Sequence, residues 1–207
     1  MHVAVASFKG GVGKTTTAIH IAAYLQTLGT TLLLDGDGTR NATEWAQRGQ
    51  GLPYRIADVR SAVKLAREFE HTVIDTGQRP SDADLKALAE GCDLLVIPAV
   101  PATMDSDGMR QTIEALAEMK ADNYRVLITK APPPPQAEAT NLRTALEKAG
   151  IPAFKVSIPL LKAFEKAAAA GVIVSAVDDP RAARAWEAYV STGKEIVAYG
   201  HSHQDHW

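Results

Sequence analysis

The sequence predicts an α/β fold with a doubly wound, mostly parallel sheet and helices on both faces. Hydrophobic and amphipathic runs alternate along the whole chain, which is typical of repeated strand–helix units. The runs 31–34 and 94–97 are continuously apolar, as expected for strands that are buried on both faces of a sheet. Because such sheets bind ligands at the carboxyl ends of their strands, we expect the functional residues at that edge.

The alternation gives each element in chain order. The predicted strands are 2–7, 31–35, 53–57, 71–75, 93–98, 124–129 and 153–157. The predicted helices are 14–28, 59–69, 81–90, 105–120, 137–149, 160–170 and 180–199. Within 105–120, Met109, Ile113 and Leu116 recur at spacings of four and three residues, so they share one helix face.

The composition indicates one globular domain, which we expect to span residues 1–199 and to end in a flexible tail at 200–207. The chain has 207 residues, and 46% of them are hydrophobic, which is enough for a buried core. Its net charge is −2, so no overall positive charge indicates nucleic-acid binding. Cys92 is the single cysteine, which excludes an internal disulfide framework. No apolar run reaches the roughly 20 residues of a membrane helix, and no signal peptide precedes the first strand, so we expect a cytoplasmic protein.

Residues 7–17 read Ser-Phe-Lys-Gly-Gly-Val-Gly-Lys-Thr-Thr-Thr and lie between the first strand and the first helix. That context is what a phosphate-binding loop requires, because glycines let backbone N–H groups approach phosphate oxygens and the helix N-terminus adds positive potential. Lys14 can reach the β- and γ-phosphates, and the Thr15 hydroxyl can bind Mg²⁺. The alternative is an ordinary turn with surface lysines. The predicted nucleotide contacts here are Lys9, Gly10, Gly11, Val12, Gly13, Lys14, Thr15 and Thr16.

One departure from the general phosphate-loop pattern is informative. Phe8 stands where the pattern has its first glycine, and a second lysine, Lys9, follows it. The run Lys-Gly-Gly-Val-Gly-Lys-Thr resembles the deviant Walker A box of the ParA/MinD family of P-loop ATPases, and the short chain is most similar to the ParF-like ParA proteins. The resemblance implies that Lys9 crosses a dimer interface to the nucleotide of the other subunit, acting beside Lys14 in catalysis.

Two acids, Asp35 and Asp37, follow the second strand. In the ParA family this place carries Asp-x-Asp-Pro-Gln, and the resemblance implies that Asp37 positions or activates the attacking water while Asp35 supports the Mg²⁺ shell. General-base help of this kind is worth about 10²–10⁴-fold in rate. The alternative is a simple turn, since Asp and Gly are turn formers. Gly38-Thr39 replaces the family's Pro-Gln, which bears on the stiffness of this loop.

The fourth strand ends in Asp75, the pattern of a Walker B acid. After a phosphate loop, this position predicts that Asp75 holds Mg²⁺ together with Thr15, and that loop 76–80 senses the γ-phosphate. Buried strands also end in Asp at ordinary turns, which is the alternative.

Three later segments have more modest signals. The resemblance implies base-side contacts at Lys130 and at Ile158 and Pro159, and a dimer-interface position for Asp105, which is equally expected as a helix N-cap. The four prolines 132–135 predict a rigid extended loop.

Window 125–194 holds ten Lys/Arg and six Asp/Glu. ParA relatives bind DNA without sequence preference through basic residues in this part of a dimer, whereas the plain alternative is a solvated helix surface. The candidates are Arg143, Lys148, Lys155, Lys162, Lys166, Arg181, Arg184 and Lys194.

We therefore expect a ParA-type partition ATPase that uses ATP and Mg²⁺, forms a homodimer with ATP, binds nucleoid DNA non-specifically and is stimulated by a ParB/ParG-like or other adaptor on its cargo. The cargo classes are plasmid, chromosome or a protein body. One alternative is a MinD-like membrane-associated ATPase, although segment 181–199 carries a net charge of only +1. Another is a metabolic enzyme of the same superfamily. An iron–sulfur ATPase is disfavoured because it needs several cysteines.

Overall fold

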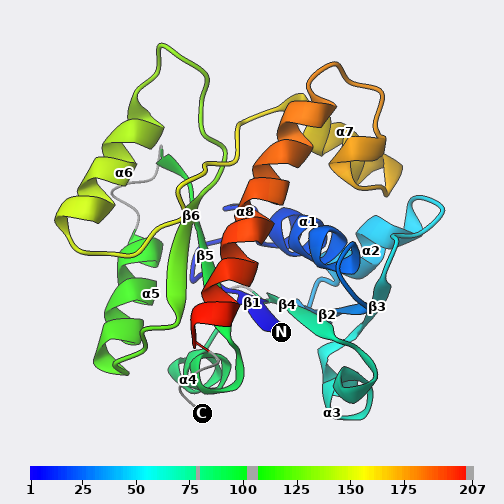
Figure 1. The fold of residues 1–207 in the computed structure, drawn as a ribbon, viewed down its shortest axis with the longest axis horizontal. Coiled ribbons are helices and arrows are strands. Elements are labelled where there is room, and N and C mark those ends of the chain that lie inside the picture. Colours follow the sequence, from blue (N-terminus) through cyan, green and yellow to red (C-terminus); the bar gives the residue numbers. More distant parts are fainter. Residues whose placement is uncertain (78–79, 102–106, 204–207) are drawn as a thin grey trace.

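The computed structural model describes residues 1–77, 80–101 and 107–203. Within these ranges, six strands form one fully parallel sheet in the order β3-β2-β4-β1-β5-β6. The strands are β1 His2–Val5, β2 Thr31–Gly36, β3 Arg55–Asp58, β4 His71–Thr76, β5 Leu94–Ala99 and β6 Tyr124–Ile128. The predicted α/β class with a parallel sheet is confirmed (Figure 1).

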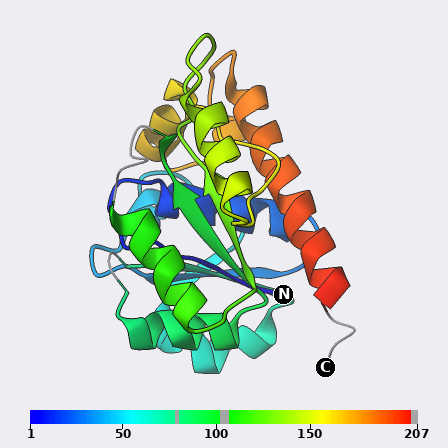
Figure 2. The same ribbon diagram turned by 90° about the vertical axis from the view of Figure 1, so that its left-hand side faces the viewer.

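Helices cover both faces of this sheet (Figures 1 and 2). They are α1 Lys14–Gln26, α2 Asn41–Gln47, α3 Ala62–Leu65, α4 Asp82–Gly91, α5 Asp107–Glu118, α6 Glu138–Lys148, α7 Lys162–Ala170 and α8 Ala182–His203. Short 3-10 turns lie at η1 Val59–Ser61, η2 Ala66–Glu68 and η4 Val174–Ala176. The last helix therefore runs four residues beyond the predicted end at 199.

The two faces form separate cores because side chains alternate along each strand. On β1, Val3 and Val5 pack into the core under α1, α7 and α8. Ala4, together with Ala6 just after the strand, packs into the core under α4, α5 and α6. All four side chains are fully buried. Burial on both faces explains why the sequence of β1 is continuously apolar from Val3 onward.

The predicted strand 153–157 is wrong. Within this segment one isolated bridge joins Ala153 to Val126 of β6, and the Phe154 N–H donates to the Val126 carbonyl at 2.9 Å. The reason is the Arg143 side chain, whose guanidinium donates to the Phe154 carbonyl oxygen at 2.6 Å and to the Val156 carbonyl oxygen at 3.4 Å. A side chain thus takes up polar groups that a continuous ladder would have used.

The predicted helix 59–69 is also wrong as a single element, since the structure divides it into η1, α3 and η2. Its apolar residues do not form one buried stripe: Leu65 is buried, whereas Val63 is 94% exposed. Conversely, α2 was not predicted. It is held by the buried pair Ala42 and Trp45, and the Trp45 indole donates to the Val172 carbonyl at 3.0 Å.

Helix α8 lies across α1, and its apolar side chains belong to the core. Tyr189 and Ile196 are buried, and at Gly193 a Cβ atom would come within 2.0 Å of the Tyr24 ring. Only a residue without a side chain permits this close approach. No helix in the described ranges is both long enough and apolar enough to cross a membrane.

His20 ties α1 to the C-terminal part of the chain. Its Nδ1–H donates to the Thr16 carbonyl at 2.6 Å and its Nε2 accepts the Val174 N–H at 3.0 Å, which requires the neutral ring. The ring stacks on Tyr189 at 4.8 Å, and the Tyr189 hydroxyl pairs with Thr17 at 3.1 Å. The first turns of α1 are thereby fixed against η4 and α8.

We predict that His20 makes the protein acid-sensitive. Complete burial lowers the pKa of His20 to about 4, so the unfolded chain binds more protons than the folded chain between that value and 6.5. The contribution of His20 to the free energy of unfolding is therefore fully present above its unfolded pKa. It is lost as the pH decreases, and the loss reaches about 3 kcal/mol near pH 4. Urea titrations at pH 7.5 and 4.5 measure this loss. His20→Gln is the control: its deficit relative to the wild type should shrink at the lower pH, and an equal deficit at both values contradicts the prediction.

Candidate functional site

The loop between β1 and α1 has the geometry of an anion cradle. Gly11 has a φ of +75° and Gly13 a φ of +90°, and both conformations favour glycine. Gly13 occupies the N-cap position of α1 and supplies no side-chain cap. The first N–H groups of the helix are therefore left for a ligand, and with the helix dipole they favour a phosphate.

Lys14, the first residue of α1, lies folded back under this loop. Its ammonium donates to the Lys9 carbonyl at 3.2 Å, and the residue is only 6% exposed. Burial lowers the pKa of Lys14, while the nearby carboxylates of Asp75 and Asp37 act in the opposite direction. The ammonium of Lys9 itself forms no hydrogen bond or ion pair within the described part of the chain.

Asp75 is a fully buried acid at the carboxyl-end edge of the sheet. It lies near the end of β4, in register with Asp35 on β2 and Val5 on β1, so three strand ends meet beside the phosphate loop. The residue is 0% exposed and neither carboxylate oxygen has a hydrogen bond of ordinary geometry within the described residues. Burial raises the pKa of Asp75 to about 7, against the opposing influence of the nearby Thr15 hydroxyl. Such an orphaned carboxylate fits a cation, and the oxygen ligands at hand suit Mg²⁺.

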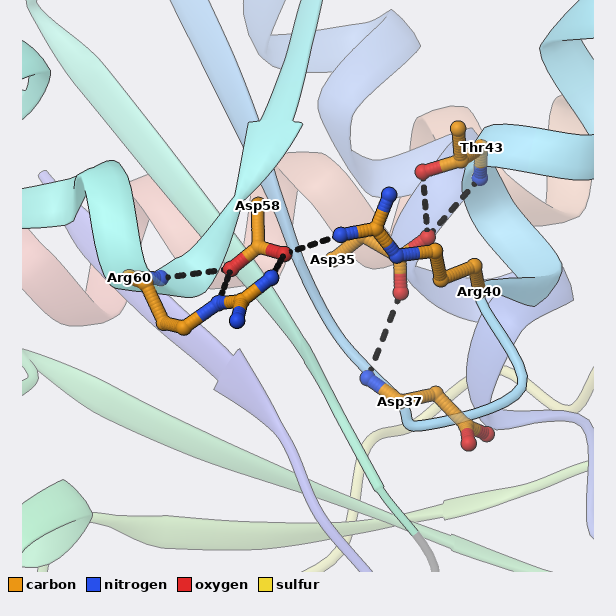
Figure 3. Close-up of polar contacts among 6 residues, drawn as sticks. All are labelled: Asp35, Asp37, Arg40, Thr43, Asp58 and Arg60. Atoms are coloured by element: carbon orange, nitrogen blue, oxygen red, sulfur yellow. Dashed lines mark hydrogen bonds and ion pairs between the residues drawn. The ribbon is translucent and has the colours of Figure 1, made fainter.

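Asp35 anchors the loop that follows β2. One carboxylate oxygen accepts the Asp37 N–H at 3.2 Å, and the other accepts the N–H and hydroxyl of Thr43 at 2.9 and 2.6 Å (Figure 3). Asp35 thus connects the loop to the first turn of α2. The sequence did not point to Thr43 for this task. The predicted place of Asp35 in a Mg²⁺ shell stays a prediction.

The Asp37 carboxylate is held by its own loop. One oxygen accepts the N–H and the hydroxyl of Thr39 at 3.0 and 2.9 Å, and the other accepts the Asn41 amide at 3.2 Å. A carboxylate offers about four lone-pair sites, so one site remains for a water or a proton. Thr39, where the family has Gln, is therefore a working partner of Asp37.

The end of β6 is fastened to the phosphate loop. The Lys130 ammonium donates to the Gly11 carbonyl at 2.7 Å, and the hydroxyl of Thr129 donates to the Val12 carbonyl at 2.8 Å. Lys130 adopts a left-handed backbone with a φ of 51°. Sequence reasoning missed Thr129, although a polar residue directly after an apolar strand was the available signal.

The other predicted base-side segment lies beside this strand end. The Ile158 carbonyl accepts the Ala131 N–H at 2.9 Å, and Pro159 lines a cavity of about 380 Å³ between the proline loop and the start of α8. Contacts of Lys130, Ile158 and Pro159 with a base stay predictions. Asp105 and most of the tip of loop 76–80, at 78–79, fall outside the described residues.

Comparison with known proteins decides the family. Residues 3–174 match the model of the CobQ/CobB/MinD/ParA nucleotide binding domain. The chain belongs to this family. It is 34% identical over 178 residues to maintenance of carboxysome distribution protein A of Gloeobacter kilaueensis, covering 83% of this chain and 82% of that protein. The protein of the same name from Halothiobacillus neapolitanus is 28% identical, with coverages of 83% and 85%.

A solved structure agrees on the fold. The MinD cell division protein of Aquifex aeolicus superposes with a TM-score of 0.73 at 17% identity, covering 95% of this chain and 96% of that one. The resemblance inferred from the phosphate loop is thus confirmed, and the site described above lies in a nucleotide-binding ATPase of the ParA/MinD type.

We predict that Asp75→Asn stabilises the nucleotide-free protein by about 1–3 kcal/mol, because it removes the negative charge of a buried carboxylate that has no hydrogen bond of ordinary geometry within the described residues. The same substitution should abolish the rise in unfolding temperature that ATP with Mg²⁺ produces, since that rise reports binding to the folded state. Thermal unfolding with and without the nucleotide measures both effects.

Thr72→Val is the matched control. The Thr72 hydroxyl is also buried and unbonded on β4, at the opposite end of the strand. This variant should gain stability and keep its full response to nucleotide. A normal nucleotide response in Asp75→Asn would remove Asp75 from the site.

Proposed function

We propose that this protein is a ParA-type ATPase that positions or segregates a large cargo. The observation that carries the proposal is the convergence of Lys14, Asp37 and Asp75 at one sheet edge, beneath a loop whose extra lysine, Lys9, has no partner for its ammonium among the described residues. A phosphate loop alone serves many ATP-using enzymes. The unpaired second lysine is what favours a nucleotide shared between two subunits.

In this proposal the chain's own groups divide the work on ATP. Backbone N–H groups of the loop hold the phosphates, and Lys14 turns from the Lys9 carbonyl to the β- and γ-phosphates. Thr15, Asp35 and Asp75 would hold Mg²⁺ directly or through water, and the bound ion would neutralise charge at the phosphates. Asp37 orients the attacking water through its remaining lone pair and accepts its proton.

ATP would bring two subunits together. The Lys9 ammonium, which has no partner in the part of the chain that the structure describes, then has the nucleotide of the other subunit as its partner, which makes dimerisation depend on the phosphates. Loss of the γ-phosphate removes part of that attraction, so hydrolysis separates the dimer.

Two of the eight candidate DNA contacts already have partners within the protein. Arg143 is engaged by backbone and Ser157, and Lys166 pairs with Asp179 at 2.8 Å. By contrast, Lys162 and Arg184 lie near the same cavity. Arg184 lines it, and so does Leu161, the residue directly before Lys162 at the start of α7. These two exposed cations, with neighbouring Arg181, form the DNA-facing set that we propose.

The cargo is proposed from the relatives. Two of them are named for carboxysome distribution, so a protein body moved over the nucleoid is the favoured cargo, with a plasmid or chromosome as the other classes. An adaptor bound to that cargo, comparable to ParB or ParG, would stimulate hydrolysis and release the dimer from DNA.

We predict that Asp37→Ala binds ATP and still forms the ATP dimer but hydrolyses ATP at least about 10²-fold more slowly, because water orientation is lost and phosphate binding is not. Phosphate release and size-exclusion chromatography measure this. Glu147→Ala, an exposed acid on α6, is the control and should behave as the wild type. Normal hydrolysis by Asp37→Ala contradicts the role of Asp37, and normal ATP affinity in Lys14→Ala contradicts the site as a whole.

A second prediction concerns DNA. Wild-type protein should bind non-specific duplex DNA with ATP, weakly with ADP or without nucleotide, and with an affinity that falls steeply as salt rises. The pair Lys162→Ala and Arg184→Ala should weaken binding and lower the log–log salt slope by about 0.9 per lost phosphate contact, while ATP hydrolysis persists. Lys166→Ala should retain its affinity, since Lys166 is already paired. The absence of DNA binding by wild type at low salt in every nucleotide state overturns the proposal.

A further inference from the structure

Arg40, in the loop that carries Asp37, has an unusual backbone. It adopts a left-handed conformation, with φ 53° and ψ 40°, at the N-cap position of α2, where its side chain makes no cap hydrogen bond. Glycine or asparagine accepts this conformation far more readily than arginine. An arginine here indicates that the side chain has a task of its own.

That task is visible in Figure 3, where the Arg40 guanidinium reaches across to the Asp58 carboxylate at the end of β3. Arg60 holds the same carboxylate from the other side, with its backbone N–H, Nε and Nη2 at 2.9, 2.8 and 2.6 Å. Asp58 is therefore oriented before Arg40 engages it. These arginines, Arg60 most strongly, keep the pKa of Asp58 well below its ordinary range.

The ion pair completes a set of anchors around Asp37. Asp35 fixes the Asp37 N–H from one end of the loop, and the Arg40 N–H donates to the Asp37 carbonyl at 2.9 Å from the other. The side chain of Arg40 then secures this second end to β3, the neighbour of β2 in the sheet. Without this ion pair, the hydrogen bonds of residues 38–40 within the described part of the chain would all lie inside loop 36–41 or reach α2.

We propose that the Arg40–Asp58 pair is a positioning element that fixes loop 36–41 and holds Asp37 in place for hydrolysis. The inference rests on the proposed role of Asp37 and deepens it. Gly38 makes the tip flexible where the family has a proline, and the ion pair restores the lost stiffness from outside the loop. Arg40 and Asp58 act through Asp37 and do not themselves touch ATP.

The test is steady-state hydrolysis by Arg40→Asn and Asp58→Asn. Asparagine accepts the left-handed backbone, so Arg40→Asn removes the tie and keeps the loop conformation available. Each variant should lower kcat about tenfold, as expected for misplacement of a catalytic group, while KM for ATP stays within about twofold. The double variant should be no slower than the single ones, because both remove the same interaction.

Arg55→Asn is the matched control, since Arg55 is an exposed arginine on β3 that pairs with Glu68 and leaves the loop untouched. Wild-type kcat in both test variants, a raised kcat, or losses that multiply in the double variant overturns the inference. Hydrogen exchange supplies a readout independent of turnover: amides 37–41 should exchange at least about tenfold faster in Arg40→Asn.

The two readouts separate this inference from the proposed function. If the wild type shows no Asp37-dependent hydrolysis, the proposed function fails and exchange alone decides whether the pair fixes the loop. If hydrolysis depends on Asp37 but both variants match the wild type in rate and exchange, only the positioning role fails.

Discussion

The register of three parallel strands is the constraint on which the rest of the structure depends. Because β2, β4 and β1 pair in parallel, Asp35, Asp75 and Val5 fall in one row, and the chain segments that follow β1 and β2 emerge on either side of the end of β4. A shift of one residue would turn each acid to the other face of the sheet. The pairing of the strands therefore determines where the acids of the site lie, and the loops add to that arrangement.

The surrounding packing gives this row a rigid base. His20 and Tyr189 secure α1 against η4 and α8, while Thr129 secures the phosphate loop against the end of β6. Loops that change conformation with nucleotide state need such a base, because their movement changes the site only when the elements beside them stay in place. Helix α1, which follows the phosphate loop directly, is held in place by these contacts.

Much of this arrangement could be read from local sequence. The glycines and Lys14 follow a spacing that phosphate binding imposes, and Asp75 follows an apolar strand, so each signal lies within a few residues. The non-local partners could not be read. Arg143 disrupts the expected strand 153–157 from a helix, and Asp58 meets Arg40 only because β3 lies beside β2. Helix α2 was missed because only Ala42 and Trp45 face inward, too few for a visible period.

The orphaned carboxylate of Asp75 has a consequence for the protein's lifetime in the cell. A folded chain that carries an unsatisfied buried charge lies closer to its unfolded state than the same chain with that charge neutralised. Proteases act on the opened population. Under the proposed function, subunits without nucleotide would therefore be degraded before subunits that have bound ATP and Mg²⁺, and the amount of protein in the cell would follow the fraction that is bound to nucleotide.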